Sequence, residues 1–171
     1  LLPLSSLEEV PRGKRTQEFS LRGWAARRRA ALYFRTLLKG LPAPVRRRVM
    51  GELAVALGVE PHEDPHHLLP MLTWEELERM ARSAVAIGSH GLTHEILTRL
   101  SASELTEQVS SSRRLLAERL GQVIRGFAYP NGRLGDFDQT TSAALRAVGY
   151  DYAMTFEPGL FASGEDPYTI P

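Results

Sequence analysis

The 171-residue chain contains no cysteine, and none of its apolar runs approaches the ~20 residues that a membrane-spanning helix needs. Without thiols it can form neither disulfides nor thiolate metal sites, so any bound metal would be held by nitrogen and oxygen ligands. The sequence also shows no secretory signal. These absences leave the compartment open, in the cytoplasm or in the cell envelope.

The composition that remains is that of an ordinary globular protein, with 43% hydrophobic and 24% charged residues. The net charge of +1 conceals an uneven distribution, because residues 1–60 carry 12 Lys and Arg against 5 Asp and Glu, whereas residues 61–171 carry 9 against 15. Basic triplets at 27–29 and 46–48 concentrate the excess. They are either solvated helix faces, which we favour, or a contact for a membrane surface or nucleic acid. We expect no nucleic-acid partner, and a membrane contact remains the lesser alternative.

The first seventy residues are predicted to be mainly helical. Apolar spacing and flanking Gly and Pro residues predict helices over 21–38 and 44–57, after a loop or arm over 1–20. Residues 59–70 contain three prolines and are typical of a linker. The linker histidines are either a metal cluster or, as we favour, solvated loop residues: His62, His66 and His67.

From residue 71 the pattern changes to alternating helices and strands. Thr73 with Glu76, and Ser101 with Glu104, have the spacing of capping boxes. The pattern predicts helices over 73–82, 101–120 and 140–148, and strands over 84–88, 123–128 and 152–155. This order is typical of a parallel α/β layer.

Two histidines follow the first predicted strand, in the sequence AIGSHGLTH. If the chain enters a helical turn there, His90 and His94 lie on one face and can bind one metal ion, because neutral imidazole is a common ligand of zinc and related metals. Ligands usually sit at strand ends in α/β folds. The alternative is a capping or solvent-facing histidine pair.

A second loop, FAYPNG, follows the next strand and is expected on the same side of the sheet. The backbone N–H of Asn131, in the turn formed by residues 130–132, could stabilise a developing oxyanion. Tyr129 could stack on a sugar ring or pack in the core. Asp136 and Asp138 could line the cleft, although a helix cap near residue 140 is the interpretation we favour.

The segments AIGSHGLTHEILTRLSASEL, RGFAYPNGRLGDFD and ALRAVGYDYAMT together resemble the polysaccharide deacetylase family, the NodB homology domain, over roughly residues 71–171. The resemblance implies a partial, distorted (β/α) barrel, with residues 1–70 as a helical insertion and linker segment. It also implies hydrolysis of N- or O-acetyl groups on a carbohydrate substrate. The resemblance further implies a divalent metal as cofactor, commonly zinc in this family. His90 and His94 match the metal ligands, and Tyr129, Pro130 and Asn131 fall in the catalytic third motif.

The sequence departs from the family pattern at several positions. It has no Asp-Asp-Gly motif for the metal aspartate and the catalytic base, and Gly91 stands where Ser or Thr is usual. Residues 128–132 replace the common Arg-Pro-Pro-Tyr-Gly, and the general-acid histidine would lie beyond Pro171. We therefore expect an internal fragment, inactive in isolation. The alternative is a non-catalytic carbohydrate-binding or regulatory relative of the same fold.

Overall fold

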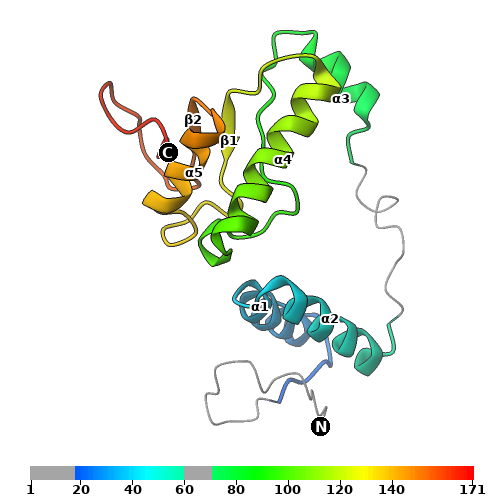
Figure 1. Ribbon diagram of the computed structural model, residues 1–171. Helices are drawn as coiled ribbons and strands as arrows, with labels where there is room; N and C mark the ends of the chain where they lie inside the picture. Colours follow the sequence, from blue (N-terminus) through cyan, green and yellow to red (C-terminus); the bar gives the residue numbers. More distant parts are fainter. Residues whose placement is uncertain (1–17, 60–70) are drawn as a thin grey trace. The chain divides into compact units, whose positions relative to one another are not determined.

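The computed structural model describes residues 18–59 and 71–171, which fall into two compact units divided between Leu69 and Pro70 (Figure 1). Each unit is described by itself. The predicted arm over 1–20 and the linker over 59–70 lie almost entirely outside the described residues, and the linker histidines lie wholly outside them.

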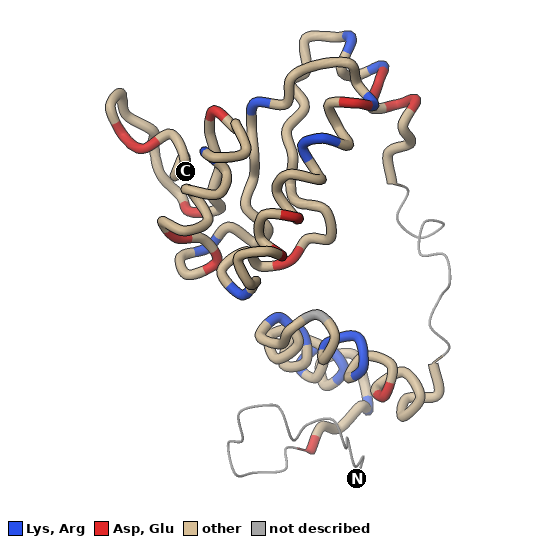
Figure 2. The backbone as a smooth tube through the Cα atoms, in the orientation of Figure 1, with Lys and Arg blue, Asp and Glu red and all other residues tan. Residues whose placement is uncertain are grey.

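The first unit contains two helices, α1 (Trp24–Lys39) and α2 (Ala43–Leu57). Both predicted helices are therefore present, and α1 starts three residues later than expected. Gly58 closes α2 in the left-handed conformation, with a φ of 63°. Residues 18–59 carry nine Lys and Arg residues against two Glu, and Figure 2 shows the basic residues distributed along both helices.

The second unit contains α3 (Trp74–Ala81), a 3₁₀ turn (Leu97–Arg99), α4 (Ala102–Leu120) and α5 (Gln139–Val148). The side chains of Thr73, Ser101 and Asp138 cap the three α-helices, each in a reciprocal capping box. The two boxes predicted from sequence are confirmed, and Asp138 caps α5 as favoured. Within the described ranges, no helix combines the length and the apolar character needed to cross a membrane.

The capping box of α4 is expected to make stability depend on pH. Hydrogen bonds from the Ser101 side chain and backbone lower the pKa of Glu104 from its ordinary value of 4.5. A carboxylate with a lowered folded-state pKa stabilises the fold above its unfolded pKa, and this contribution is lost as pH falls through the folded value. When the free energy of unfolding is measured below pH 5, it should therefore decrease less steeply with falling pH in Glu104→Gln than in the wild type. Glu118→Gln, which removes a carboxylate from the same helix outside the box, is the control; an equally shallow decrease there would contradict the assignment.

The sheet of the second unit is parallel and short. Strands β1 (Gly126–Ala128) and β2 (Tyr152–Met154) pair in parallel, with Phe127 opposite Ala153. Isolated parallel bridges extend the layer on both sides, from Ser89 to Phe127 and from Met154 to Ile170. Figure 1 shows β1 and β2 side by side, with α4 running alongside them. The described residues thus form an α/β layer with two strands.

The predicted strand over 84–88 is wrong. The chain there forms only the single bridge at Ser89, whose N–H donates to Gly126 and whose carbonyl accepts from Ala128. The preceding segment is exposed (Val85 is 45% accessible) and pairs with no second strand among the described residues. An apolar run without neighbours on both sides lacks the backbone hydrogen bonds that fix a strand.

One core joins the helices and the sheet of the second unit. It draws residues from α4, β1, α5 and β2, and its largest buried side chains are aromatic. The Phe127 ring meets the Tyr129 and Tyr150 rings edge to face, at centroid distances of 5.8 and 5.2 Å. The core therefore includes Phe127 of β1 and Tyr129, the residue that follows β1 at the start of the second candidate loop.

Candidate functional site

The two histidines come together without the helical turn expected from their spacing. Residues 91–94 are not helical, because Gly91 has a φ of 82° and His94 a φ of 59°. Their rings nevertheless lie close, with centroids 4.8 Å apart and planes at 75°. Both side chains are on the exposed surface. The spacing predicted that the two rings would be neighbours. A loop with two left-handed residues brings them together, rather than one face of a helix.

The His90 ring is held by a backbone carbonyl. Its Nδ1 atom lies 2.7 Å from the carbonyl oxygen of Ala128, at the end of β1. A carbonyl oxygen only accepts, so Nδ1 carries the proton and donates, and the lone pair of the neutral ring is then on Nε2. Metal-binding histidines almost always use their second nitrogen in this way. The contact fixes both the orientation and the tautomer of His90.

The separation of the rings fits a shared ion. Two imidazoles that bind zinc through nitrogens about 2.0–2.1 Å away, at a near-tetrahedral angle, have ring centres about 5 Å apart. The observed 4.8 Å agrees with this value. No carboxylate completes the set, since the described part of the chain contains no group of three or more His, Cys, Asp or Glu residues able to hold a metal. The ring separation therefore matches that of two nitrogen ligands on one ion, and the described residues supply no third ligand beside them.

The Pro-Asn-Gly turn lies beside the histidine loop. A Cβ built on Gly91 would come within 3.6 Å of the Pro130 ring, which is fully buried. Asn131 and Gly132 both have left-handed backbones, with φ of 63° and 61°, the pattern of a tight turn that Asn-Gly tolerates best. A Cβ on Gly132 would lie 2.8 Å from the backbone nitrogen of Phe156, so only glycine fits. Among the described residues, no acceptor binds the backbone N–H of Asn131.

Tyr129 belongs to the core. Its side chain is 3% exposed and stacks on Phe137, with centroids 4.9 Å apart, and its hydroxyl donates to the Tyr168 carbonyl and contacts Ser142. Burial raises the pKa of the Tyr129 hydroxyl, which keeps it protonated. Stacking on a sugar would need an exposed ring face. The structure corrects that interpretation and supports the packed alternative.

The two aspartates after the second loop serve local structure. Asp136 accepts a hydrogen bond from the backbone of Arg133, and Asp138 accepts one from the backbone of Thr141 as the cap of α5. Neither forms a metal-binding group with the histidines. The helix-cap interpretation of Asp138 is thus the correct one of the two considered.

A sequence model of the family described as Polysaccharide deacetylase matches residues 49–153, from within α2 to β2. The chain belongs to the polysaccharide deacetylase family. The matched range contains both histidines and the Pro-Asn-Gly turn, so the candidate site lies within the family's homologous region. It begins before residue 71, where the sequence resemblance was expected to start.

Known members of the polysaccharide deacetylase family match parts of this chain. YxkH from Bacillus subtilis (strain 168), itself assigned to the polysaccharide deacetylases, is 28% identical over 105 residues, which make up 61% of this chain and 35% of YxkH. The solved BpsB deacetylase domain from Bordetella bronchiseptica has a TM-score of 0.54 at 19% identity, covering 69% of this chain and 62% of that chain. BC0361, a polysaccharide deacetylase from Bacillus cereus, has a TM-score of 0.52 at 19% identity, covering 71% and 41%. These structures share the fold, and the chain spans only part of each relative.

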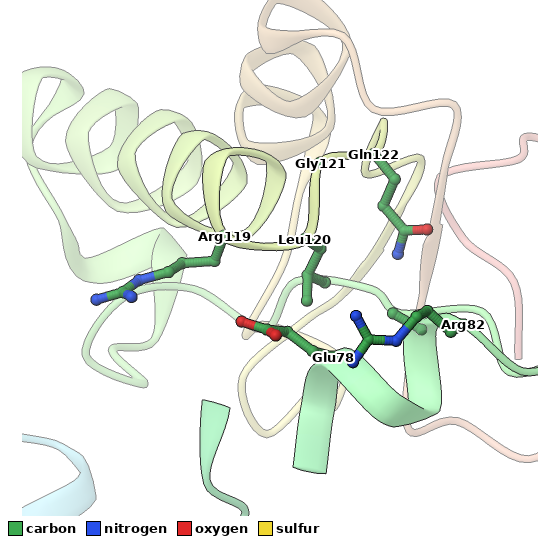
Figure 3. Close-up of a pocket in the computed structure, with 7 residues that line it drawn as sticks. Glu78, Arg82, Arg119, Leu120, Gly121 and Gln122 are labelled. Atoms are coloured by element: carbon green, nitrogen blue, oxygen red, sulfur yellow. The ribbon is translucent and has the colours of Figure 1, made fainter. Parts of the chain in front are cut away.

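Two surface hollows in the second unit of this deacetylase-family chain are lined by neither histidine. One of about 300 Å³ is formed by the ends of α3 and α4 (Figure 3). In Figure 3, Glu78 lies between Arg82 and Arg119, so its carboxylate offsets one of the two positive charges there. Arg119 is about 16 Å along α4 from Gln108, which contacts the histidine loop. The candidate site is therefore a surface feature made by two loops.

Gln108 is the residue of this site that sequence reasoning missed. Its side-chain amide binds the loop between the two histidines. The available signal was its place on α4: Gln108 is three residues after buried Leu105 and next to buried Val109, on the helix stripe that faces the core. A polar residue at such a position usually has a partner inside the protein.

Proposed function

We propose that this chain is part of a metal-dependent hydrolase that removes acetyl groups from carbohydrate, by N- or O-deacetylation. The observation that carries the proposal is the pair of imidazoles 4.8 Å apart, one of them fixed through Nδ1 by the Ala128 carbonyl. Membership of the polysaccharide deacetylase family supports the reaction class. His90 and His94 are the proposed ligands, and zinc is the proposed ion.

A divalent ion at such a site polarises the acetyl carbonyl and lowers the pKa of water from 15.7 to about 7. The chain's own residues contribute geometry. The Ala128 carbonyl engages Nδ1 of the His90 ring, which leaves Nε2 as the nitrogen that can bind an ion, and the buried Pro130 lies against the histidine loop. The backbone N–H of Asn131, held in a left-handed turn, is proposed to donate to the oxyanion that develops on the substrate.

The rest of the proposed machinery is a carboxylate pair and a late histidine, which the sequence does not place in this chain. We propose that residues 71–171 are part of a distorted (β/α) barrel and that residues 1–70 are a helical insertion and linker within it. The parallel layer from Ser89 to Ile170 supports the first part of this proposal. The 171-residue chain by itself is then expected to release little or no acetate.

The absence of a third ligand from the described residues favours one alternative, a carbohydrate-binding or regulatory relative that does not catalyse. The two functions differ in one measurement. A protein holding this sequence that binds an acetylated oligosaccharide and releases no acetate, even with zinc added and with the Asp-Asp-Gly motif present, would establish the alternative.

The proposed metal site can be tested in the chain itself by zinc titration calorimetry. We expect His90→Ala and His94→Ala each to weaken Zn²⁺ binding by about tenfold or more, because each removes one of two nitrogen ligands. The matched control replaces the three linker histidines, His62, His66 and His67, by alanine and should retain the affinity. If the control variant loses Zn²⁺ binding while His90→Ala and His94→Ala retain it, the linker histidines bind the metal and the proposal is contradicted.

A further inference from the structure

The loop between the two histidines is fastened to α4 by one side chain. The Gln108 Oε1 atom accepts hydrogen bonds from the backbone N–H groups of Leu92, at 3.1 Å, and Thr93, at 3.0 Å. Its Nε2 atom donates to the Thr93 hydroxyl at 2.9 Å. Both the oxygen and the nitrogen of the amide therefore form hydrogen bonds with the segment that separates His90 from His94.

Besides these bonds, the segment has one long hydrogen bond, from the Gly91 N–H to the Ser89 hydroxyl at 3.4 Å, and the nearby Pro130 ring. Residues 91–94 belong to no helix or strand, and both Gly91 and His94 have left-handed φ values. Consecutive N–H groups that point the same way need a common acceptor, and Gln108 supplies it. The conformation that places His94 beside His90 is thus the one in which Leu92 and Thr93 face the Gln108 carbonyl oxygen.

A second contact from the same helix fixes the start of the loop. Ser112, one turn beyond Gln108 on α4, accepts a hydrogen bond from the Ser89 hydroxyl at 2.8 Å, and both serines are buried. Because Ser89 also pairs with β1, the chain is anchored immediately before His90. His90 is held in addition by the Ala128 carbonyl. Within the described part of the chain, no hydrogen bond anchors the His94 ring in this way, so its position depends on the loop that Gln108 fastens.

We propose that Gln108 is a positioning residue of the histidine pair: by accepting the Leu92 and Thr93 N–H groups it sets the separation of the two rings. This inference rests on the proposed function, in which His90 and His94 bind one ion. Gln108 itself binds no ion. It acts on affinity through the backbone of the loop, in the way that residues behind metal ligands do.

The test compares Zn²⁺ affinity and amide hydrogen exchange in the 171-residue chain. Gln108→Met keeps the length of the side chain and removes its amide; it should weaken Zn²⁺ binding by about 10–100-fold and speed exchange at Leu92 and Thr93. Gln108→Glu keeps an acceptor for both N–H groups, and the Thr93 hydroxyl can rotate to donate to it. This variant should retain wild-type affinity or exceed it, together with slow exchange. Gln139→Met, at the exposed start of α5, is the matched control and should change neither quantity.

Each outcome decides the inference. If Gln108→Met binds Zn²⁺ as tightly as the wild type while His90→Ala does not, Gln108 has no positioning role and the proposed function stands. If the histidine variants also bind as tightly as the wild type, both ideas are overturned. Equal losses in Gln108→Met and Gln108→Glu would contradict the role of the acceptor. Should the Met variant fail to fold, Gln108→Ala, which favours the helix, makes the same comparison.

Discussion

Alanine in place of His90 or His94 is expected to reduce acetate release at least about a thousandfold, in any polypeptide that holds this sequence together with the family's Asp-Asp-Gly motif. The reason is that each substitution removes one of the two nitrogen ligands proposed from the ring geometry. Lowering the pKa of water from 15.7 to about 7 corresponds to roughly 12 kcal/mol at 1.36 kcal/mol per unit. No other interaction proposed for this site approaches that value, since one oxyanion donor contributes about 2.7–4 kcal/mol.

The measurement is acetate released from an acetylated oligosaccharide at saturating zinc, with protein folding verified for each variant. His66→Ala, which removes a histidine outside the pair, is the control and should leave turnover unchanged. Turnover in His90→Ala or His94→Ala within tenfold of the wild type would rule out the proposed ligands.

The largest expected effect on stability is that of Phe127→Ala, at about 3–5 kcal/mol in the free energy of unfolding. Phe127 is 1% exposed and meets both Tyr129 and Tyr150 edge to face. Removing the ring leaves a cavity in the core of the second unit. The two neighbouring aromatic rings cannot fill it without losing their own hydrogen bonds, from Tyr129 to Tyr168 and from Tyr150 to Val109. The backbone of Phe127 also pairs with Ser89, next to the histidine loop.

Urea unfolding of the chain, followed by circular dichroism, measures this change. Phe156→Ala is the matched control, because Phe156 is 66% exposed and its ring meets mainly the Arg133 guanidinium, 4.7 Å from its centroid. The control should lose less than about 1 kcal/mol. If the two variants lose similar amounts, the core of the second unit is not organised around Phe127.

Local chemistry explains why the helices were predictable. A capping box involves residues three apart, so Thr73 with Glu76 and Ser101 with Glu104 specify a helix start without reference to the rest of the chain. The glycines that end α2, α4 and α5 act equally locally, through left-handed backbones that other residues avoid. Family membership was also predictable, because the histidine and Pro-Asn-Gly segments occur in order and at family spacing.

The strand over 84–88 and the role of Tyr129 were not predictable in the same way. An apolar run becomes a strand only if neighbours supply hydrogen bonds on its edges, and Ser89 alone has that partner. An aromatic residue after a strand can face solvent or the interior, and the sequence offers no sign of the Phe137 ring that stacks on Tyr129. Both outcomes depend on tertiary contacts, from Ser89 to Phe127 and from the Tyr129 hydroxyl to Tyr168, that join residues distant in sequence.

The sequence by itself determined the order and the approximate limits of the helices and the family, and it predicted the two histidines as a pair, because each follows from residues close together along the chain. Only the tertiary structure decided how the histidines meet. Their approach depends on the Ala128 carbonyl, on left-handed turns at Gly91 and His94, and on the Gln108 amide reaching across from α4. Hydrogen bonds between groups 15 to 38 residues apart select that loop conformation, and a short-range pattern cannot encode them.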